Sequence, residues 1–214
     1  MPLSIRAGVP SVVDIEVRDI DDRPVVWVDV DSTDRQGALS STSSSQIEAG
    51  AVLARTKRMP LVAVIRSSGA DIQEGFAALH GWGQAARAIA DCSGVVPVLM
   101  IVDGPAVSGP ALLIGLADLV VMTSDSYAFV SGPTMVAEFT GVAIDNEELG
   151  GPSSHARYSG ATSLVAGDLD AAAEMIANLL AYLPAHNDEE PPNWPTDDSI
   201  DRSTPEAGAL MPTT

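Results

Sequence analysis

The chain has 214 residues, of which 46% are apolar, enough for a sizeable core within about one domain. Its 29 acidic and 11 basic residues give a formal net charge of −18, which argues against a partner that is nucleic acid or an anionic membrane. One cysteine, Cys92, excludes an internal disulfide and a CxxC zinc site. With no long apolar run and no signal-peptide layout, we expect a soluble cytoplasmic protein. The sequence also shows no constellation of metal ligands, so we expect no metal in this chain.

Strand-like and helix-like segments alternate from residue 25 onward. Residues 25–30 (VVWVDV) predict a strand, and a helix is expected over about 46–58, with Ser44 or Ser45 as its N-cap. Residues 61–65 (LVAVI) are an unbroken apolar run, typical of a strand buried on both faces. The helix expected over 72–91 repeats its apolar residues with a period close to 3.6, which predicts a core-facing side made of Ile72, Phe76, Leu79, Ala86 and Ile89.

The second half continues the alternation. Strands are expected over 95–102, 119–122 and 127–130, with a helical turn over 109–116. A last helix from 169 or 170 to 182 carries the apolar stripe Ala172, Ile176, Leu179, Leu180 and Leu183. Alternating strands and helices favour an α/β fold with parallel strands. Residues 186–206 are rich in Pro, Asp and Glu and indicate a solvated tail or linker.

Two joints between a strand and a helix are rich in small residues: 66–75 (RSSGADIQEG) and 103–113 (DGPAVSGPALL). At each joint, free backbone N–H groups stand at the positive end of a helix dipole, where they could stabilise an oxyanion. Small residues also form ordinary tight turns at such places, so either joint alone is weak evidence.

Five ordered blocks of the sequence carry a resemblance: GADIQEGFAALHGWG, SGVVPVLMIVDGPAVSGPAL, SDSYAFVSGPTMVAEFTG, EELGGPSSHARYSGATS and AYLPAHN. Together they resemble the N-terminal half of biotin-dependent acyl-CoA carboxyltransferase subunits of the propionyl-CoA and acetyl-CoA carboxylase β type. The family versions include GGARIQEG, TSYMFVTGP and EELGGAxxHxxxSGVAH. With weaker similarity before them, the blocks cover residues 21–187.

The resemblance implies a crotonase (ClpP-like) fold of repeated ββα units, with a single carboxyltransferase-type half-domain over 21–187. Residues 1–20 would be an N-terminal extension, and 188–214 an acidic, Pro-rich tail. It also implies that backbone amides of Gly69 or Ala70, and of Ser108 or Gly109, hold a thioester oxygen as an enolate develops. Substrate-binding positions implied by the family blocks are Gln73, Gly132, Pro133 and His155.

The resemblance further implies an enzyme component that moves a carboxyl group between carboxybiotin and an acyl-CoA. Biotin would be carried on a separate protein, and no metal would be needed. The expected partners are a second carboxyltransferase half-subunit, a biotin carboxyl carrier protein and biotin carboxylase, in a hetero-oligomer. The alternatives are a degenerate scaffold subunit without catalysis and an acyl-CoA decarboxylase of the same fold.

Several positions depart from the related patterns. Leu112 and Thr134 stand where crotonase hydratases carry glutamates, so a hydratase would lack its acid and base. The family's DSGGAR becomes RSSGAD, so that Arg66 and Asp71 could form an ion pair of reversed order. Residues 37–47 have no Lys or Arg where the family meets CoA phosphates, and the nearest bases downstream are Arg55, Lys57 and Arg58.

Overall fold

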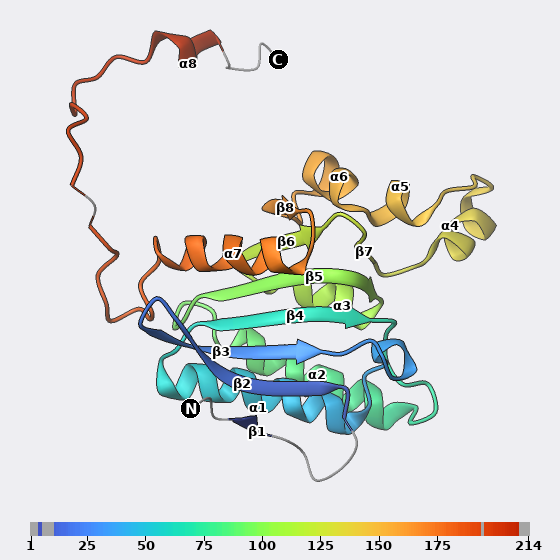
Figure 1. Cartoon of the computed structure of the whole chain (residues 1–214). Coiled ribbons are helices and arrows are strands. Elements are labelled where there is room, and N and C mark those ends of the chain that lie inside the picture. The colour runs from blue at the N-terminus through green and yellow to red at the C-terminus, as the bar shows by residue number, and fades with distance from the viewer. Residues whose placement is uncertain (1–3, 6–10, 194, 210–214) are drawn as a thin grey trace.

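The computed structural model describes residues 4–5, 11–193 and 195–209, and its centre is an eight-stranded sheet with helices on both faces (Figure 1). The strand order is β1-β2-β3-β4-β5-β6-β8, and β7 pairs with β5 outside this order. The antiparallel edge consists of β1 (Ser4–Ile5), β2 (Val13–Ile20) and β3 (Arg23–Val30). The parallel strands are β4 (Leu61–Ser67), β5 (Val98–Val107), β6 (Leu119–Thr123), β7 (Tyr127–Phe129) and β8 (Leu164–Ala166). The predicted α/β fold with parallel strands is therefore confirmed.

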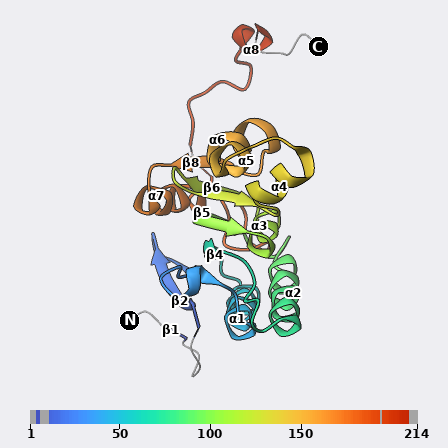
Figure 2. The same ribbon diagram turned by 90° about the vertical axis from the view of Figure 1, so that its right-hand side faces the viewer.

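Helices cover the two faces of the sheet unequally. Figure 2 shows α1 (Ser41–Lys57) and α2 (Phe76–Ala90) on one side and α7 (Leu169–Leu180) on the other. The shorter elements are η1 (Arg35–Gly37), α3 (Gly109–Ile114), α4 (Pro133–Thr140), α5 (Asn146–Gly150), α6 (Pro152–Ser154), η2 (His155–Ser159) and α8 (Pro205–Ala209). Within the described ranges, no helix combines the length and the apolar character that crossing a membrane requires.

Side-chain alternation along the strands builds a core on each face. In β3, Val26 and Val28 face α1 and α2, whereas Val25 and Trp27 face α7, and all four are at most 3% exposed. This arrangement explains the unbroken apolar run of β4, because a strand covered on both faces has no side left for polar residues. Burial of each large aliphatic side chain contributes about 1.5–3 kcal/mol, so the two cores hold the sheet together.

Helix α1 begins earlier than the sequence predicts. Its N-cap is Ser40, whose Oγ accepts a hydrogen bond from the Ser43 N–H at 3.0 Å, and not Ser44 or Ser45. Ser44 is fully buried, and a Cβ added to Gly81 of α2 would lie only 3.1 Å from the Ser44 Cβ. The serines are therefore part of a close helix–helix contact, which an apolar periodicity does not report.

The predicted core-facing side of α2 is wrong at its large residues. Ile72 is 91% exposed, Phe76 is 89% exposed and Leu79 is 57% exposed. The side that packs inward is made mostly of small residues: Ala78, Gly81, Ala85, Ala88 and Ile89. Small residues allow α2 to approach α1 closely, which leaves the large apolar side chains on the outer surface of the helix.

The predicted helix α7 is confirmed, and Arg23 of β3 caps its C-terminal end. Ala172, Ile176 and Leu180 are buried against the sheet, and Asp168 caps the N-terminus by accepting from the Ala171 N–H at 2.8 Å. At the other end, Arg23 Nη1 donates to the carbonyl oxygens of Leu180 and Leu183, each at 2.7 Å. A guanidinium at a helix C-terminus satisfies free carbonyls and opposes the negative end of the dipole.

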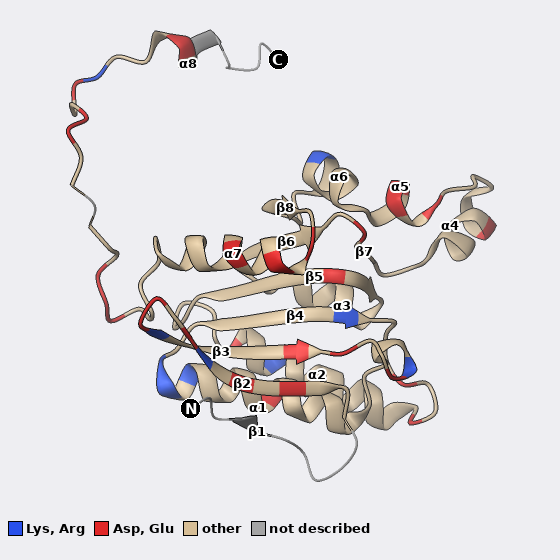
Figure 3. Ribbon diagram, viewed as in Figure 1, with Lys and Arg blue, Asp and Glu red and all other residues tan. Residues whose placement is uncertain are grey.

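Among the described residues of the acidic segment after α7, the hydrogen bonds and ion pairs to the rest of the chain lie at its start. The Asn187 N–H donates to the Val95 carbonyl at 2.9 Å, and Arg58 contacts Asn187 Oδ1 at 2.6 Å and Asp188 at 2.8 Å. From there the chain runs away from the sheet, with acidic residues along much of its length (Figure 3). Exposed acids in a Pro-rich segment favour solvation over packing.

The buried thiol of Cys92 gives a first prediction. Cys92 is 0% exposed, and burial raises the pKa of its thiol to about 11. We expect almost no thiolate at pH 8 in the folded state, and hence no reaction with a thiol reagent within minutes. Because the folded-state pKa lies above the unfolded value, Cys92 should also reduce stability as the pH rises from about 9 towards 11.

The measurement is the absorbance change with Ellman's reagent at pH 8, without and with denaturant. Full reaction only after unfolding is the expected result. A stoichiometric reaction of the native chain at pH 8 would contradict the assigned burial of the thiol.

Candidate active site

The two predicted joints lie next to each other at the carboxyl ends of β4 and β5. Ser67, the last residue of β4, is paired with Ala106 of β5. A Cβ added to Gly69 would lie 3.5 Å from the Val107 carbonyl oxygen and 3.7 Å from the Ser108 Cβ. The joints are thus in direct contact, as expected for neighbouring parallel strands that each lead into a helix.

In the first joint, one of the two candidate amides has an acceptor within the chain. Ser67 Oγ donates to the Gly37 carbonyl at 2.6 Å and accepts from the Gly69 N–H at 3.3 Å. The carbonyl of Gly69 accepts from the Leu39 N–H at 2.8 Å, which joins this segment to Leu39 through an isolated β-bridge between Leu39 and Ala70. Across the described ranges, the Ala70 N–H has no acceptor from the protein.

The second joint repeats this arrangement. The Ser108 N–H donates to the Phe129 carbonyl of β7 at 2.9 Å. The next amide, that of Gly109, opens α3 and finds no acceptor in the described part of the chain. Each joint therefore has one amide bonded to the protein, and the amide after it remains available.

Ser108 has an unusual backbone conformation. Its φ of 62° and ψ of −120° belong to a region that glycine adopts easily and residues with a Cβ avoid. Strain of this kind costs about 1–3 kcal/mol and concentrates at functional sites.

We therefore expect Ser108→Gly to raise the free energy of unfolding by about 1 kcal/mol. Two effects set this value. Releasing the backbone strain stabilises the folded state, and the greater chain entropy of glycine in the unfolded state offsets about 0.5–1 kcal/mol of that gain. Urea unfolding measures the change. The exposed Ser93, at negative φ, provides the matched control, because Ser93→Gly should only destabilise. An equal loss of unfolding free energy in Ser108→Gly and Ser93→Gly would contradict the assignment of backbone strain to Ser108.

Gly109 is enclosed by an aromatic side chain. A Cβ at this position would lie 2.7 Å from Trp82 Nε1 and 2.9 Å from Trp82 Cδ1. The indole nitrogen is itself buried without an acceptor in the described chain. The sequence pattern does not indicate this role of Trp82, although its place in the GWG segment of α2 brings it against the second joint. The Trp82 indole therefore leaves room only for glycine at position 109.

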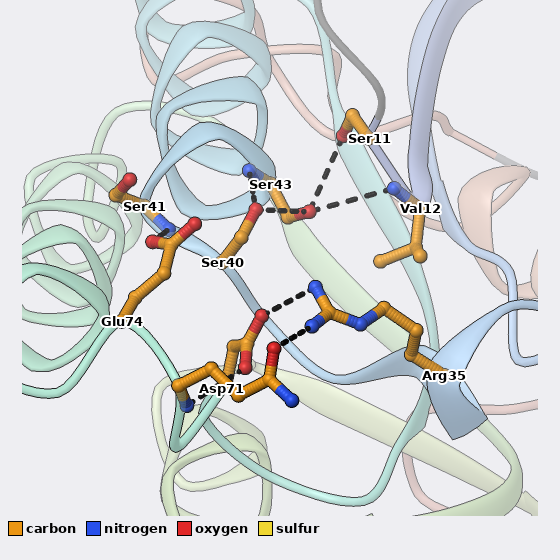
Figure 4. Close-up of polar contacts among 9 residues, drawn as sticks. Ser11, Val12, Arg35, Ser40, Ser41, Ser43, Asp71 and Glu74 are labelled. Atoms are coloured by element: carbon orange, nitrogen blue, oxygen red, sulfur yellow. Dashed lines mark hydrogen bonds and ion pairs between the residues drawn. The ribbon is translucent and has the colours of Figure 1, made fainter.

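A network of polar contacts ties the first joint to the loop before α1 (Figure 4). Arg35 Nη1 donates to Asp71 Oδ2 at 2.6 Å and its Nη2 donates to Gln73 Oε1 at 2.9 Å. Glu74 Oε2 accepts from the Ser41 N–H at 2.7 Å and so occupies the N-terminus of α1. The expected substrate-binding residue Gln73 is thus at the exposed rim of the joint, with its side-chain oxygen held by Arg35.

Arg66 and Asp71 do not pair with each other, contrary to the ion pair considered from the reversed motif. Asp71 pairs with Arg35, whereas Arg66 contacts Asp29 at 2.6 Å and Asp103 at 2.7 Å, bridging three neighbouring strands. Burial lowers the pKa of the Arg66 guanidinium, but the hydrogen bond to Asp103 and the charge of Asp29 outweigh it and raise the pKa overall. The reversal therefore gives each charge a different partner.

Of the remaining expected residues, His155 lies beside the second joint. His155 lines an apolar cavity behind α3, with Nε2 2.8 Å from the Ala128 carbonyl and Nδ1 2.7 Å from Ser159 Oγ. Gly132 and Pro133 form the N-cap and first turn of α4, farther along the chain from the joints. The structure thus brings the four candidate amides together, and Gln73 and His155 flank them.

The chain has the crotonase-like α/β architecture, with two amide-bearing joints at one end of a parallel sheet. The carboxyl transferase domain family matches residues 19–214, and the chain belongs to this family. The propionyl-CoA carboxylase beta chain of Roseobacter denitrificans is 35% identical over 195 residues, 90% of this chain and 38% of that protein. The methylmalonyl-CoA decarboxylase subunit alpha of Propionigenium modestum is 32% identical over 194 residues, again 90% and 38%.

A solved structure of similar fold is the transcarboxylase 12S hexamer with hydrolysed methylmalonyl-coenzyme A bound. It superimposes with a TM-score of 0.84 at 34% identity, over 87% of this chain and 36% of that one. The chain therefore spans well under half the length of the relatives that it matches.

Proposed function

We propose that this chain is the acyl-thioester side of a split, biotin-dependent carboxyltransferase. It would move a carboxyl group between carboxybiotin and the α-carbon of an acyl-CoA. In this proposal residues 21–187 form the working half-domain and 188–214 a linker or tail. The observation that carries it is the pair of available amides, Ala70 and Gly109, on adjacent joints.

The free N–H groups of Ala70 and Gly109 explain how this chain would stabilise the enolate of the acyl thioester. When the α-carbon of a thioester loses its proton, negative charge develops on the thioester oxygen. Two fixed N–H donors stabilise that charge without having to reorganise, and removal of one such donor typically costs about 10²–10³ in rate. Ser67 and the Phe129 carbonyl would hold the neighbouring amides, and so set the direction of the two donors.

No side-chain base of this chain is required by the proposal. Leu112 and Thr134 replace the glutamates of a hydratase, and both side chains lie at the surface. Carboxybiotin, bound to its carrier, would supply the carboxyl group, and biotin would take the α-proton. This chain would contribute orientation and charge stabilisation.

The partner half is supported by apolar side chains left uncovered near the site. Ile72 lies in the first joint and Phe76 and Leu79 follow it, whereas Met135 and Phe139 lie on α4 beyond the second joint. Exposed apolar surface of this extent is typical of an interface with another protein. A second half-subunit, together with the biotin carboxyl carrier protein and biotin carboxylase, would complete the hetero-oligomer.

The catalytic proposal is tested by replacing Ala70 with lactic acid, an alanine analogue with an ester oxygen in place of the N–H. With the partner half and carboxylated carrier, we expect transfer to acyl-CoA to fall by about 10²–10³ while the melting temperature stays unchanged. The same replacement at Ala185, whose N–H contacts an exposed glutamate, should leave transfer intact. Unchanged transfer after the Ala70 replacement would remove the amide from the mechanism.

The partner interface gives a further prediction. Phe76→Glu places a charge on a side chain that is 89% exposed, so the chain should fold normally but lose association with the partner half by more than 10-fold. Ile200→Glu, at a side chain 99% exposed in the tail, is the matched control. Analytical ultracentrifugation of the mixed halves measures both. Equal association of the two variants would place the interface elsewhere.

The basic residues at the end of α1 and beside the first joint offer little to the phosphates of CoA. Arg55 and Lys57 lie in the last turn of α1 and Arg58 is its C-cap, about 20–25 Å along the helix from the N-terminus that Glu74 of the first joint contacts. Arg35, beside the joint, is already paired with Asp71. We propose that the partner supplies the phosphate contacts, so CoA alone should bind the mixed halves more tightly than this chain.

A second candidate is decarboxylation of an acyl-CoA. It is favoured by the 32% identity to a methylmalonyl-CoA decarboxylase subunit alpha and would use the same two amides. Release of CO₂ from a carboxyacyl-CoA without carrier biotin would favour it. If neither reaction occurs, and no acyl-CoA binds, the chain is a scaffold subunit.

A further inference from the structure

The cavity behind the second joint has the features of a binding site for an apolar chain. It has a volume of about 390 Å³, within the about 300–1,000 Å³ of small-molecule sites. Met122 and Ala128, in its wall, are 1% and 5% exposed, whereas Leu112 and Val130 are 51% and 53% exposed and mark its opening. The cavity therefore leads from the surface into the core between α3 and β7.

The lining offers no free hydrogen-bonding side chain. Of the residues that line it, His155 has the one polar side chain, and both of its ring nitrogens already contact oxygen atoms of the chain. A polar ligand would lose its bonds to water here and gain none in return. An uncharged apolar group would not face that cost.

The cavity opens beside the proposed donor. Leu112 and Ala111 lie within one turn of Gly109 on α3, and side chains on a helix lean towards its N-terminus, which here is the Gly109 end. Phe129 contributes both a wall of the cavity and the carbonyl that accepts from the Ser108 N–H. A group attached to a carbonyl held at Gly109 can therefore enter the cavity directly.

We propose that this cavity binds the acyl chain of the thioester and selects an uncharged, apolar group of about six carbons or more. The volume is more than twice the about 150 Å³ of an apolar cavity that holds benzene. This inference rests on the proposed function, since that function places the thioester carbonyl at the two amides.

The test uses acyl thioesters of N-acetylcysteamine, which carry no phosphate and so do not depend on CoA contacts. The full chain is titrated with the acetyl, butanoyl, hexanoyl and octanoyl thioesters while the methyl NMR signals of Met122 and Ile114 are followed. We expect both signals to shift, and affinity to rise about fourfold per methylene, on the order of 10²-fold from butanoyl to octanoyl.

A variant that fills the cavity sharpens the test. Gly115 lines it, and an added Cβ would meet its nearest atom at an ordinary 3.5 Å, so Gly115→Val should fold and abolish the preference for long chains. Gly167→Val, at an exposed site with open space around the new Cβ, is the matched control. Methyl signals that do not shift, or equal affinity for acetyl and octanoyl thioesters, would overturn the inference. Transfer of carboxyl groups to short acyl-CoAs only would overturn it while leaving the proposed function intact.

Discussion

Arg66→Met is expected to lower the free energy of unfolding by about 3–5 kcal/mol. The Arg66 side chain is 16% exposed and contacts Asp29 and Asp103 at 2.6 and 2.7 Å. Its removal leaves two carboxylates facing each other across β4 without a countercharge. The loss comes from these unpaired acids more than from the contacts themselves. Urea denaturation followed by circular dichroism provides the measurement.

Two comparisons separate this explanation from a general loss of packing. Arg55→Met removes an exposed pair with Asp91 at 3.4 Å and should cost no more than about 1 kcal/mol. Adding Asp29→Asn and Asp103→Asn to Arg66→Met should recover most of the loss, because neutral amides need no countercharge. Failure of the triple variant to recover stability would show that the guanidinium acts mainly through packing.

Gly109→Ala is expected to destabilise the chain by about 1–3 kcal/mol and to reduce carboxyl transfer by at least about 10²-fold. The new Cβ would lie 2.7 Å from the indole nitrogen of Trp82, which has little freedom to move between α2 and α3. Either the indole or the start of α3 must shift, and a shift of α3 displaces the Gly109 N–H. Tryptophan fluorescence reports the first change and reconstituted transfer reports the second.

The same substitution at a glycine outside the joints and the cavity provides the control. At the exposed Gly167, an added Cβ would have nothing within 4 Å, so Gly167→Ala should change neither stability nor transfer by a comparable amount. A second substitution, Trp82→Leu, should restore stability to Gly109→Ala by making room for the methyl group. If the double variant is as unstable as the sum of the two single variants, the contact with Trp82 is not the cause.

The sequence predicts the fold best where a segment is buried on both faces or carries one clear stripe. The apolar run of β4 and the apolar stripe of α7 predict their elements because these side chains pack in the cores of this chain. The serine-rich start of α1 escapes prediction because Ser43 and Ser44 are buried by close packing and not by hydrophobicity. The short helices α4 and α5 bury almost nothing, so no core-facing stripe marks them in the sequence.

The sequence likewise predicts one part of the candidate site and misses another. Small residues after two strands predict the joints, but a sequence does not report which of two consecutive amides is already bonded. That depends on distant partners, the Ser67 hydroxyl turned towards Gly37 and the Phe129 carbonyl of β7. The apolar stripe of Phe76 and Leu79 gives the opposite error, because periodicity does not distinguish an apolar surface that meets the core from one that is exposed.

Helix α4 has a consequence for dynamics. It has eight residues, none of them buried, whereas isolated helices shorter than about 12–15 residues are marginal in water. Its backbone hydrogen bonds should therefore open independently of the sheet, and its amide hydrogens should exchange with deuterium long before those of β4 and β5. A protein that binds Met135 and Phe139 would slow that exchange, so the rate at α4 reports assembly even when no reaction is being measured.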